Sequence, residues 1–184
     1  MIIGRIYYPV LVLGYGRRVG IWTCGCKKKC KGCTSPELQD ESSGKEISVE
    51  ELLKYVNPVI AEADGVTISG GEPFDQAKEL RRLIEQLLEM SVDDILVYTG
   101  NTYQELNSLQ NEDVQYCLKN IAALVDGAYV QELDDGTGLR GSSNQRLYMN
   151  KYRERYQNWG NCKRKQQCIE LSKGLVFIGL PEES

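Results

Sequence analysis

Apolar positions along the chain alternate between two spacings, which predict strands and helices in turn. Residues 65–69 form a short β-branched and apolar run that ends in two glycines, a pattern typical of a buried strand. Over residues 80–88, apolar side chains recur at the i, i+3, i+4, i+7 spacing of one helix face. We expect strands near the N-terminus and over 19–23, 65–69, 95–99, 121–125 and 175–179.

Two helix starts carry a local signal. Ser48 and Thr102 are each followed three residues later by glutamate, the form of a capping box. The helix after Ser48 should end at Pro58, because proline lacks the N–H that a helix interior needs. Strands and helices that alternate at this spacing predict βαβ units and a parallel sheet. Residues 131–145 look like a loop, and residues 151–168 are polar without a clean period.

Length and composition limit the protein class. A chain of 184 residues with 41% hydrophobic and 26% charged side chains is typical of one soluble domain. No apolar run approaches the roughly 20 residues that cross a bilayer. The apolar N-terminal stretch follows no charged segment and precedes no small-residue cleavage site. We therefore expect a cytoplasmic protein.

Charge is distributed unevenly along the chain. Residues 1–33 carry seven basic and no acidic side chains, residues 34–139 carry six basic and 22 acidic ones, and residues 140–184 carry nine basic and four acidic ones. This asymmetry favours anionic ligands or partners near the two ends, although any single lysine is more often simply hydrated. We expect the basic C-terminal segment to be ordered, to pack on the edge of the domain, and to attract and help position an acidic partner without touching the cluster.

The chain has no histidine. This excludes Ser-His-Asp triads, Cys-His nucleophile pairs and histidine-ligated zinc. Catalysis must therefore come from cysteine, carboxylate, lysine or tyrosine side chains, or from a bound cofactor.

Four of the seven cysteines lie within ten residues, and Cys26, Cys30 and Cys33 have the spacing C-x3-C-x2-C. Three thiolates on one loop can hold three irons of a cubane cluster and leave the fourth open. Zinc stays an alternative, but it needs a fourth ligand. Cys24 is only two residues from Cys26, and the other cysteines are more than 80 residues away. The lysines between the thiols would offset a negative cluster and face an acidic electron donor.

A glycine-rich turn follows the strand over 65–69. Glycines at Gly70 and Gly71 allow close approach of the backbone to a ligand, and Glu72 adds a carboxylate before Pro73. The turn falls at the C-terminal end of a strand, where parallel sheets place their sites. By itself, such a turn is more often only structural.

The two motifs together resemble the radical S-adenosylmethionine (radical SAM) superfamily. Segments 16–37, 69–76, 98–105 and 124–146 are similar to the activating proteins of anaerobic ribonucleotide reductases, and in the last of them the run GSSNQ is distinctive. The resemblance implies an α/β fold, a partial, open β/α barrel of about five or six parallel strands. It also implies a radical SAM core over 1–150 and a C-terminal extension over 151–184 packed on that core.

The resemblance further implies a [4Fe–4S] cluster and S-adenosylmethionine as cofactors. A reduced cluster would cleave S-adenosylmethionine to a 5′-deoxyadenosyl radical, which takes a hydrogen atom from a glycine of a glycyl-radical enzyme such as an anaerobic ribonucleotide reductase. A flavodoxin- or ferredoxin-like protein would supply electrons, and neither nucleic acid nor membrane is an expected partner. The implied cluster ligands are Cys26, Cys30 and Cys33, and the implied S-adenosylmethionine contacts are Gly32, Cys33, Thr34, Gly70, Gly71, Glu72 and Pro73. Thr99, Gly100 and Asp126 lie where strands end and are further candidates for contacts with this cofactor, although Asp126 could equally start a turn.

Two other interpretations stay open. A radical SAM enzyme of this kind could act on a peptide or small molecule, with the C-terminal extension building the substrate site. The other interpretation is a non-enzymatic iron–sulfur or zinc-binding module. In such a module the cysteine loop would bind the metal without S-adenosylmethionine chemistry. Asn144 and Gln145 are weaker candidates for the recognition of a partner segment, and Cys162 and Cys168 are too few for a second metal site.

Overall fold

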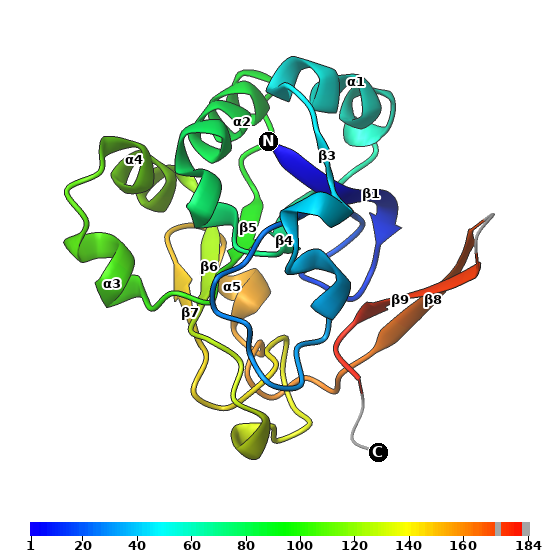
Figure 1. Cartoon of the computed structure of the whole chain (residues 1–184), viewed down its shortest axis with the longest axis vertical. Coiled ribbons are helices and arrows are strands. Elements are labelled where there is room, and N and C mark those ends of the chain that lie inside the picture. The colour runs from blue at the N-terminus through cyan, green and yellow to red at the C-terminus, as the bar shows by residue number, and fades with distance from the viewer. Residues whose placement is uncertain (172–173, 182–184) are drawn as a thin grey trace.

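A seven-stranded mixed sheet runs through the centre of the protein (Figure 1). The computed structural model describes residues 1–171 and 174–181. Along the sheet the strands follow the order β3-β1-β2-β4-β5-β6-β7. Their bounds are β1 (Ile2–Val10), β2 (Arg18–Thr23), β3 (Lys45–Glu46), β4 (Gly65–Gly70), β5 (Ile95–Tyr98), β6 (Ala123–Asp126) and β7 (Arg146–Met149).

Four strands in this sheet are parallel. β2, β4, β5 and β6 pair in parallel register, while β1 joins β2 and β7 joins β6 in antiparallel register. The predicted α/β class is confirmed, but the expectation of five or six parallel strands is wrong. At both ends of the sheet the outer strands pair in antiparallel register. Among the described residues, β3 and β7 are the two edge strands.

Helices fill the connections between the parallel strands. The side chain of Ser48 accepts a hydrogen bond from Glu51 N–H at 3.1 Å, and Thr102 forms the complete capping box with Glu105, so both predicted helix starts are confirmed. Pro58 does not end the first helix. It lies in the last turn, where it removes a single backbone hydrogen bond close to solvent. The helices are α1 (Val49–Ile60), α2 (Ala77–Glu89), α3 (Tyr103–Ser108), α4 (Glu112–Asn120) and α5 (Arg153–Tyr156).

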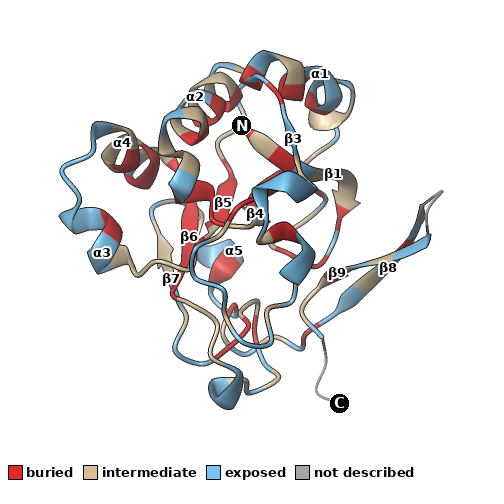
Figure 2. Cartoon of the chain, viewed as in Figure 1, coloured by how far each residue is buried: buried red, intermediate tan, exposed pale blue. Residues whose placement is uncertain are grey.

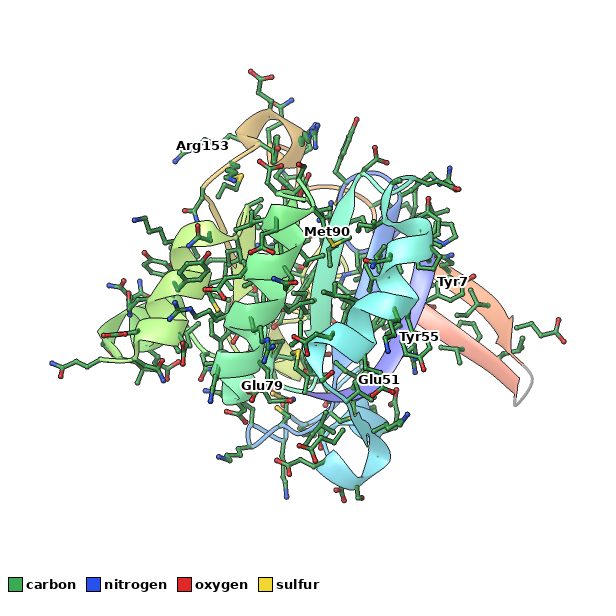
Figure 3. All side chains as sticks on the ribbon, turned by 90° about the horizontal axis from the view of Figure 1, so that it is seen from above. Tyr7, Glu51, Tyr55, Glu79, Met90 and Arg153 are labelled. Atoms are coloured by element: carbon green, nitrogen blue, oxygen red, sulfur yellow. The ribbon has the colours of Figure 1, made fainter. Side chains whose placement is uncertain are left out.

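The main core lies between one face of the sheet and the helices. Seen from above, α1 and α2 lie side by side across this face (Figure 3). Ile95 and Val97 of β5 point into this core, whereas Leu96 between them points to the opposite face, as the two-residue period of a strand requires. The central strands are buried and the outer faces of the helices are exposed (Figure 2).

The C-terminal segment covers part of the opposite face. Tyr156 and Trp159 are buried against Leu96, Ala123 and Val125 of β5 and β6. The Tyr156 hydroxyl also donates a 2.9 Å hydrogen bond to the buried carboxylate of Asp94. These contacts attach the start of that segment to the central sheet.

Basic side chains after residue 139 pair with acidic side chains from the middle of the chain. Arg164 is 2% exposed and its guanidinium lies 2.7 Å from Asp134. These charges are therefore partly compensated within the chain, and the expectation that they attract an acidic partner stays a prediction. The other pairs are Arg140–Asp135 at 2.7 Å, Arg146–Asp126 at 3.3 Å, Lys151–Asp93 at 3.2 Å and Arg155–Asp94 at 2.9 Å.

The last two strands, β8 (Gln166–Leu171) and β9 (Gly174–Gly179), form a separate antiparallel sheet, which we call the C-terminal arm. The predicted strand over 175–179 is confirmed, although it does not join the central sheet. Ile169 and Ile178 of the arm are buried with Val10 and Trp22 of the sheet. The arm thus rests on the β1 side of the protein and extends outward from it (Figures 1 and 3). No helix in the described ranges is long and apolar enough to cross a membrane.

Candidate functional site

The cysteine loop begins directly after β2. Backbone hydrogen bonds from Gly25 N–H to Leu38 and from Cys26 N–H to Gln39, both 3.0 Å, hold the start of the loop. Further along, Cys33 N–H donates to Cys30 at 3.3 Å. Gly25 and Gly32 have positive φ angles of 94° and 73°, which favour glycine. These constraints fold the three thiols of the motif onto one turn-rich loop.

Cys24 is oriented differently from the three motif cysteines. Its side chain is 1% exposed and is buried in a cluster with Leu38 and Trp22. A Cβ placed on Gly4 would lie 2.7 Å from its sulfur, so the thiol fills a space that Gly4 leaves. Burial raises the pKa of Cys24. The structure therefore makes Cys24 a core residue beside the loop.

The Gly-Gly-Glu-Pro turn after β4 lies against the start of the cysteine loop. Gly71 N–H donates to Thr23 at 2.8 Å, and Glu72 N–H donates to Gly25 at 2.7 Å. A Cβ on Gly71 would lie 2.2 Å from the Gly25 carbonyl oxygen, closer than any side chain permits. Glycine at position 71 therefore allows two backbones to meet, and this contact positions the cysteine loop.

The carboxylate of Glu72 is buried beneath this turn. It accepts hydrogen bonds from Phe74 N–H at 3.0 Å, from the Thr99 hydroxyl at 2.8 Å and from Gly100 N–H at 2.8 Å. Burial raises the pKa of Glu72, while these donors favour the charged form and limit the rise. Glu72 thus connects the turns that follow β4 and β5.

The three motif cysteines and the two turns meet in one cleft. The cleft opens to solvent, and the centres of water-sized groups can occupy about 160 Å³ inside it. The cleft lies at the C-terminal ends of the parallel strands, where such sheets bind ligands. Of the sequence-predicted site residues, those that line it are Cys26, Cys30, Cys33, Thr34, Gly70, Gly71, Thr99 and Gly100.

Four predicted residues lie outside the cleft lining. Gly32 shapes the cysteine loop, and Pro73 starts a short buried 3-10 helix, η3 (Pro73–Gln76). Glu72 connects the turns from below. Asp126 is fully buried and accepts hydrogen bonds from the N–H groups of Tyr103 at 2.6 Å and Arg146 at 3.2 Å. In this geometry the last two carboxylates hold backbone segments in place.

Other residues that line the cleft carry weak sequence signals. The Arg5 guanidinium lies 5.5 Å from the centre of the Trp22 ring, and both side chains form part of the wall. Gln145 also lines the wall, and its amide bridges Gly141 N–H and the Gly127 carbonyl, both at 2.7 Å. The GSSNQ run supplies this bridge, so its glutamine holds the loop in place.

The C-terminal arm reaches the same cleft. Phe177, Ile178, Gly179 and Leu180 line its mouth together with the cysteines. Part of the extension therefore borders the cleft, and the expectation that it does not touch the cluster stays a prediction. The sequence of residues 140–184 does not distinguish a strand that lines the cleft from an ordinary edge strand. The contact between the arm and the cleft depends on how the arm packs against β1.

The donor set of the cleft fits an iron–sulfur cluster. Within residues 1–171 and 174–181, no three His, Cys, Asp or Glu side chains gather closely enough to hold a single metal ion. The three thiols all line the same cleft. Burial raises the pKa of Cys26, while backbone N–H groups of Lys28 and Lys29 hydrogen-bond to it and favour its thiolate, which is the form that binds iron.

Comparisons with known proteins agree with this geometry. Residues 12–148 match the family described as a 4Fe-4S single cluster domain. The chain is 33% identical over 147 residues to the anaerobic ribonucleoside-triphosphate reductase-activating protein of Escherichia coli (strain K12), covering 76% of this chain and 93% of the relative. The chain belongs to this family of activating proteins. The members from Vibrio cholerae (33% over 150 residues, 77% and 94% covered) and Enterobacteria phage T4 (29% over 152 residues, 79% and 92% covered) are further relatives.

The range that matches the 4Fe-4S family, residues 12–148, contains the cysteine loop, the Gly-Gly-Glu-Pro turn and the ends of β5 and β6. The predicted resemblance to reductase-activating proteins is confirmed, and the family supports the predicted 4Fe–4S cluster. The C-terminal arm lies beyond the range that the family description matches.

Proposed function

We propose that this chain is a radical SAM activating enzyme for an anaerobic ribonucleoside-triphosphate reductase. The observation that carries the proposal is the cleft in which Cys26, Cys30 and Cys33 meet Gly70 and Gly71 of the turn after β4. When bound, the reduced cluster and S-adenosylmethionine together supply the 5′-deoxyadenosyl radical that removes a hydrogen atom from a glycine of the reductase. The protein's own residues hold, orient and shield these groups.

Cys26, Cys30 and Cys33 would hold three irons of the cluster and leave one iron for S-adenosylmethionine. The N–H groups of Lys28 and Lys29 that favour the Cys26 thiolate would also stabilise negative charge on the cluster. Lysine side chains at 27, 28, 29 and 31 surround these cysteines. Their positive charge favours reduction of the cluster and the approach of an acidic flavodoxin- or ferredoxin-like donor.

The turns after β4 and β5 would hold S-adenosylmethionine. Gly70 and Gly71 bring backbone groups to the cleft wall, and the Thr99 and Gly100 positions supply the neighbouring wall. We propose that Glu72 acts here by fixing both turns through its hydrogen bonds to Thr99 and Gly100. Residues 1–150 would form the radical SAM core, with residues 151–184 packed on it.

Four single cysteine variants test the proposal. Cys24→Ala, Cys26→Ala, Cys30→Ala and Cys33→Ala are reconstituted anaerobically with iron and sulfide. Wild type and Cys24→Ala should bind about four irons per chain, while each motif variant loses the intact cluster. Cys24→Ala is the matched control, because that thiol is buried away from the cleft.

Formation of 5′-deoxyadenosine and of a glycyl radical on the reductase is then measured with a reductant. Cluster binding without 5′-deoxyadenosine would favour a non-enzymatic iron–sulfur module. Cleavage without a glycyl radical would favour a radical SAM enzyme with a peptide or small-molecule substrate. Loss of iron in Cys24→Ala together with its retention in Cys26→Ala would show that the ligand assignment is wrong.

A further inference from the structure

The two faces of the C-terminal arm differ in their surroundings. On one face, Ile169 and Ile178 are buried against the central sheet. On the opposite face, Leu175 is 63% exposed and Phe177 is 59% exposed. The two side chains lie two residues apart on β9, so both project from the same face of the strand. The arm therefore presents a pair of large apolar side chains to solvent.

This exposed face is continuous with the cleft. Phe177 lines the mouth of the cavity that holds the three motif cysteines, and Leu175 extends the same face outward along β9. Other large exposed apolar side chains, such as Tyr55 on α1 and Leu109 after α3, lie on elements that do not line the cleft. The apolar pair on the arm is thus placed where a macromolecular substrate would enter.

The cysteine-loop side of the cleft carries basic side chains. Lys28 lines the cleft, and its ammonium group lies 4.0 Å from Glu105 in a largely exposed pair. Lys31 is 81% exposed and lies 3.7 Å from Glu132. Exposed pairs of this kind contribute little energy, so a carboxylate of a partner can replace Glu105 or Glu132 beside these lysines. A chain segment that crosses the cleft would meet lysines on one side and an apolar wall on the other.

We propose that the exposed face of the arm, Leu175 and Phe177, is a docking surface for the partner protein whose glycine enters the cleft. This inference rests on the function proposed above. The occupant is an extended protein segment with at least one large apolar side chain beside the target glycine, and with acidic residues on the side of the cysteine loop. Burial of Leu175 and Phe177 by that segment adds affinity for the partner, while the cofactor contacts stay on the turns after β4 and β5.

The test separates partner binding from cofactor chemistry. Leu175→Ser and Phe177→Ser are compared with Leu109→Ser, a control that removes an exposed leucine on another surface. Iron content and circular dichroism establish that each reconstituted variant is folded. Two quantities are then measured anaerobically: 5′-deoxyadenosine formed without partner, and the Kd for the full-length anaerobic ribonucleoside-triphosphate reductase of the same source.

Leu175→Ser should keep wild-type cleavage and raise the Kd for the reductase roughly tenfold, with a similar or larger rise for Phe177→Ser. Leu109→Ser should change neither quantity. An unchanged Kd in both arm variants overturns the docking surface, as does a loss of cleavage in Leu175→Ser, which would place that residue in the cofactor site. Absence of cleavage in the wild type would instead contradict the proposed function, so the two failures are distinguishable.

Discussion

The Thr99 hydroxyl donates a 2.8 Å hydrogen bond to the buried carboxylate of Glu72. This bond joins the turn after β5 to the turn after β4, two segments that are adjacent in the sheet. The other carboxylate oxygen accepts from Gly100 N–H at 2.8 Å. Because both turns line the cleft, one buried side chain fixes the relative position of two of its walls.

Replacement of Glu72 by glutamine should separate these walls. The glutamine amide nitrogen cannot accept the hydrogen bond that Gly100 N–H donates, and a buried donor without a partner costs about 1–3 kcal/mol. We expect Glu72→Gln to lower the free energy of unfolding by about that amount and to weaken S-adenosylmethionine binding. Urea unfolding and calorimetry measure the two effects. Asp75→Asn, an exposed change in the same turn, is the control, and equal behaviour of the two variants would contradict a bracing role.

The two glycines on these turns should respond differently to alanine. At Gly71, a Cβ would lie 2.2 Å from the Gly25 carbonyl oxygen, so the turn and the cysteine loop must move apart. We expect Gly71→Ala to reduce bound iron and to lower stability by about 1–3 kcal/mol. At Gly100 the nearest atom to a Cβ is the flexible Lys28 side chain at 3.2 Å. Gly100→Ala should therefore keep its iron and lose cleavage activity, because the added methyl group narrows the cleft.

Iron analysis of the two alanine variants after anaerobic reconstitution checks this contrast. Normal iron in Gly71→Ala would show that the cysteine loop does not depend on its backbone contact with the turn. Loss of iron in Gly100→Ala would show that the turn after β5 supports the cluster as well as the cofactor.

Local signals predict the parts of this fold that are decided locally. Ser48 and Thr102 mark helix starts because their side chains bond to backbone N–H groups three residues away. The helix α4 is not predicted, although Asn111 caps it and Val114, Cys117 and Leu118 form its buried face. One of its three core positions is a cysteine, which weakens the apolar pattern. β7 is missed because it is a partly exposed edge strand, and its pairing with β6 is decided by long-range contacts.

The site shows the same division. The spacing of Cys26, Cys30 and Cys33 identifies the loop, because ligands of one cluster must be close in space and are here close in sequence. The roles of Glu72 and Asp126 are not predictable in this way. Apart from Phe74 N–H, the partners named for them lie 20 or more residues away, so only the folded chain shows that each carboxylate holds other segments in place.

Cys117 should make stability sensitive to alkaline pH. Cys117 lies on α4 near the start of α2, and burial raises the pKa of its thiol to about 12 from an ordinary value of 9.0. The unfolded chain therefore loses the thiol proton near pH 9, while the folded chain keeps it to about pH 12. Because the folded state binds more protons in this window, the free energy of unfolding should fall as pH rises through it, by up to about 1.4 kcal/mol per pH unit.

Chemical unfolding of wild type and Cys117→Ala at a series of pH values above 9 isolates this contribution. The variant has lower stability at neutral pH because a buried group is removed, but its stability should fall less steeply with pH. Parallel curves for the two proteins would show that Cys117 ionises equally easily in the folded and unfolded states.

Arg164 should be needed for folding, whereas its neighbour Lys165 should not. The Arg164 guanidinium is 2% exposed, pairs with Asp134 at 2.7 Å and donates to the backbone carbonyls of Arg140 at 2.7 Å and Gly141 at 3.0 Å. Arg164→Glu would place a carboxylate against Asp134 and leave those carbonyls without a donor. We expect a loss of roughly 3–5 kcal/mol of stability.

Lys165 is exposed, so Lys165→Glu should change stability by no more than about 0.5 kcal/mol. Urea unfolding of the two variants measures this difference.

Lys165→Glu also tests whether positive charge on the segment assists a partner, because it alters charge without breaking a buried pair. One outcome is that Lys165→Glu binds the reductase as the wild type does at low salt, while Arg164→Glu shows only a lower free energy of unfolding. In that case the basic residues of the segment stabilise the fold. Partner contact then rests on the apolar face of the arm. Full stability in Arg164→Glu would instead mean that the pair with Asp134 contributes nothing to folding.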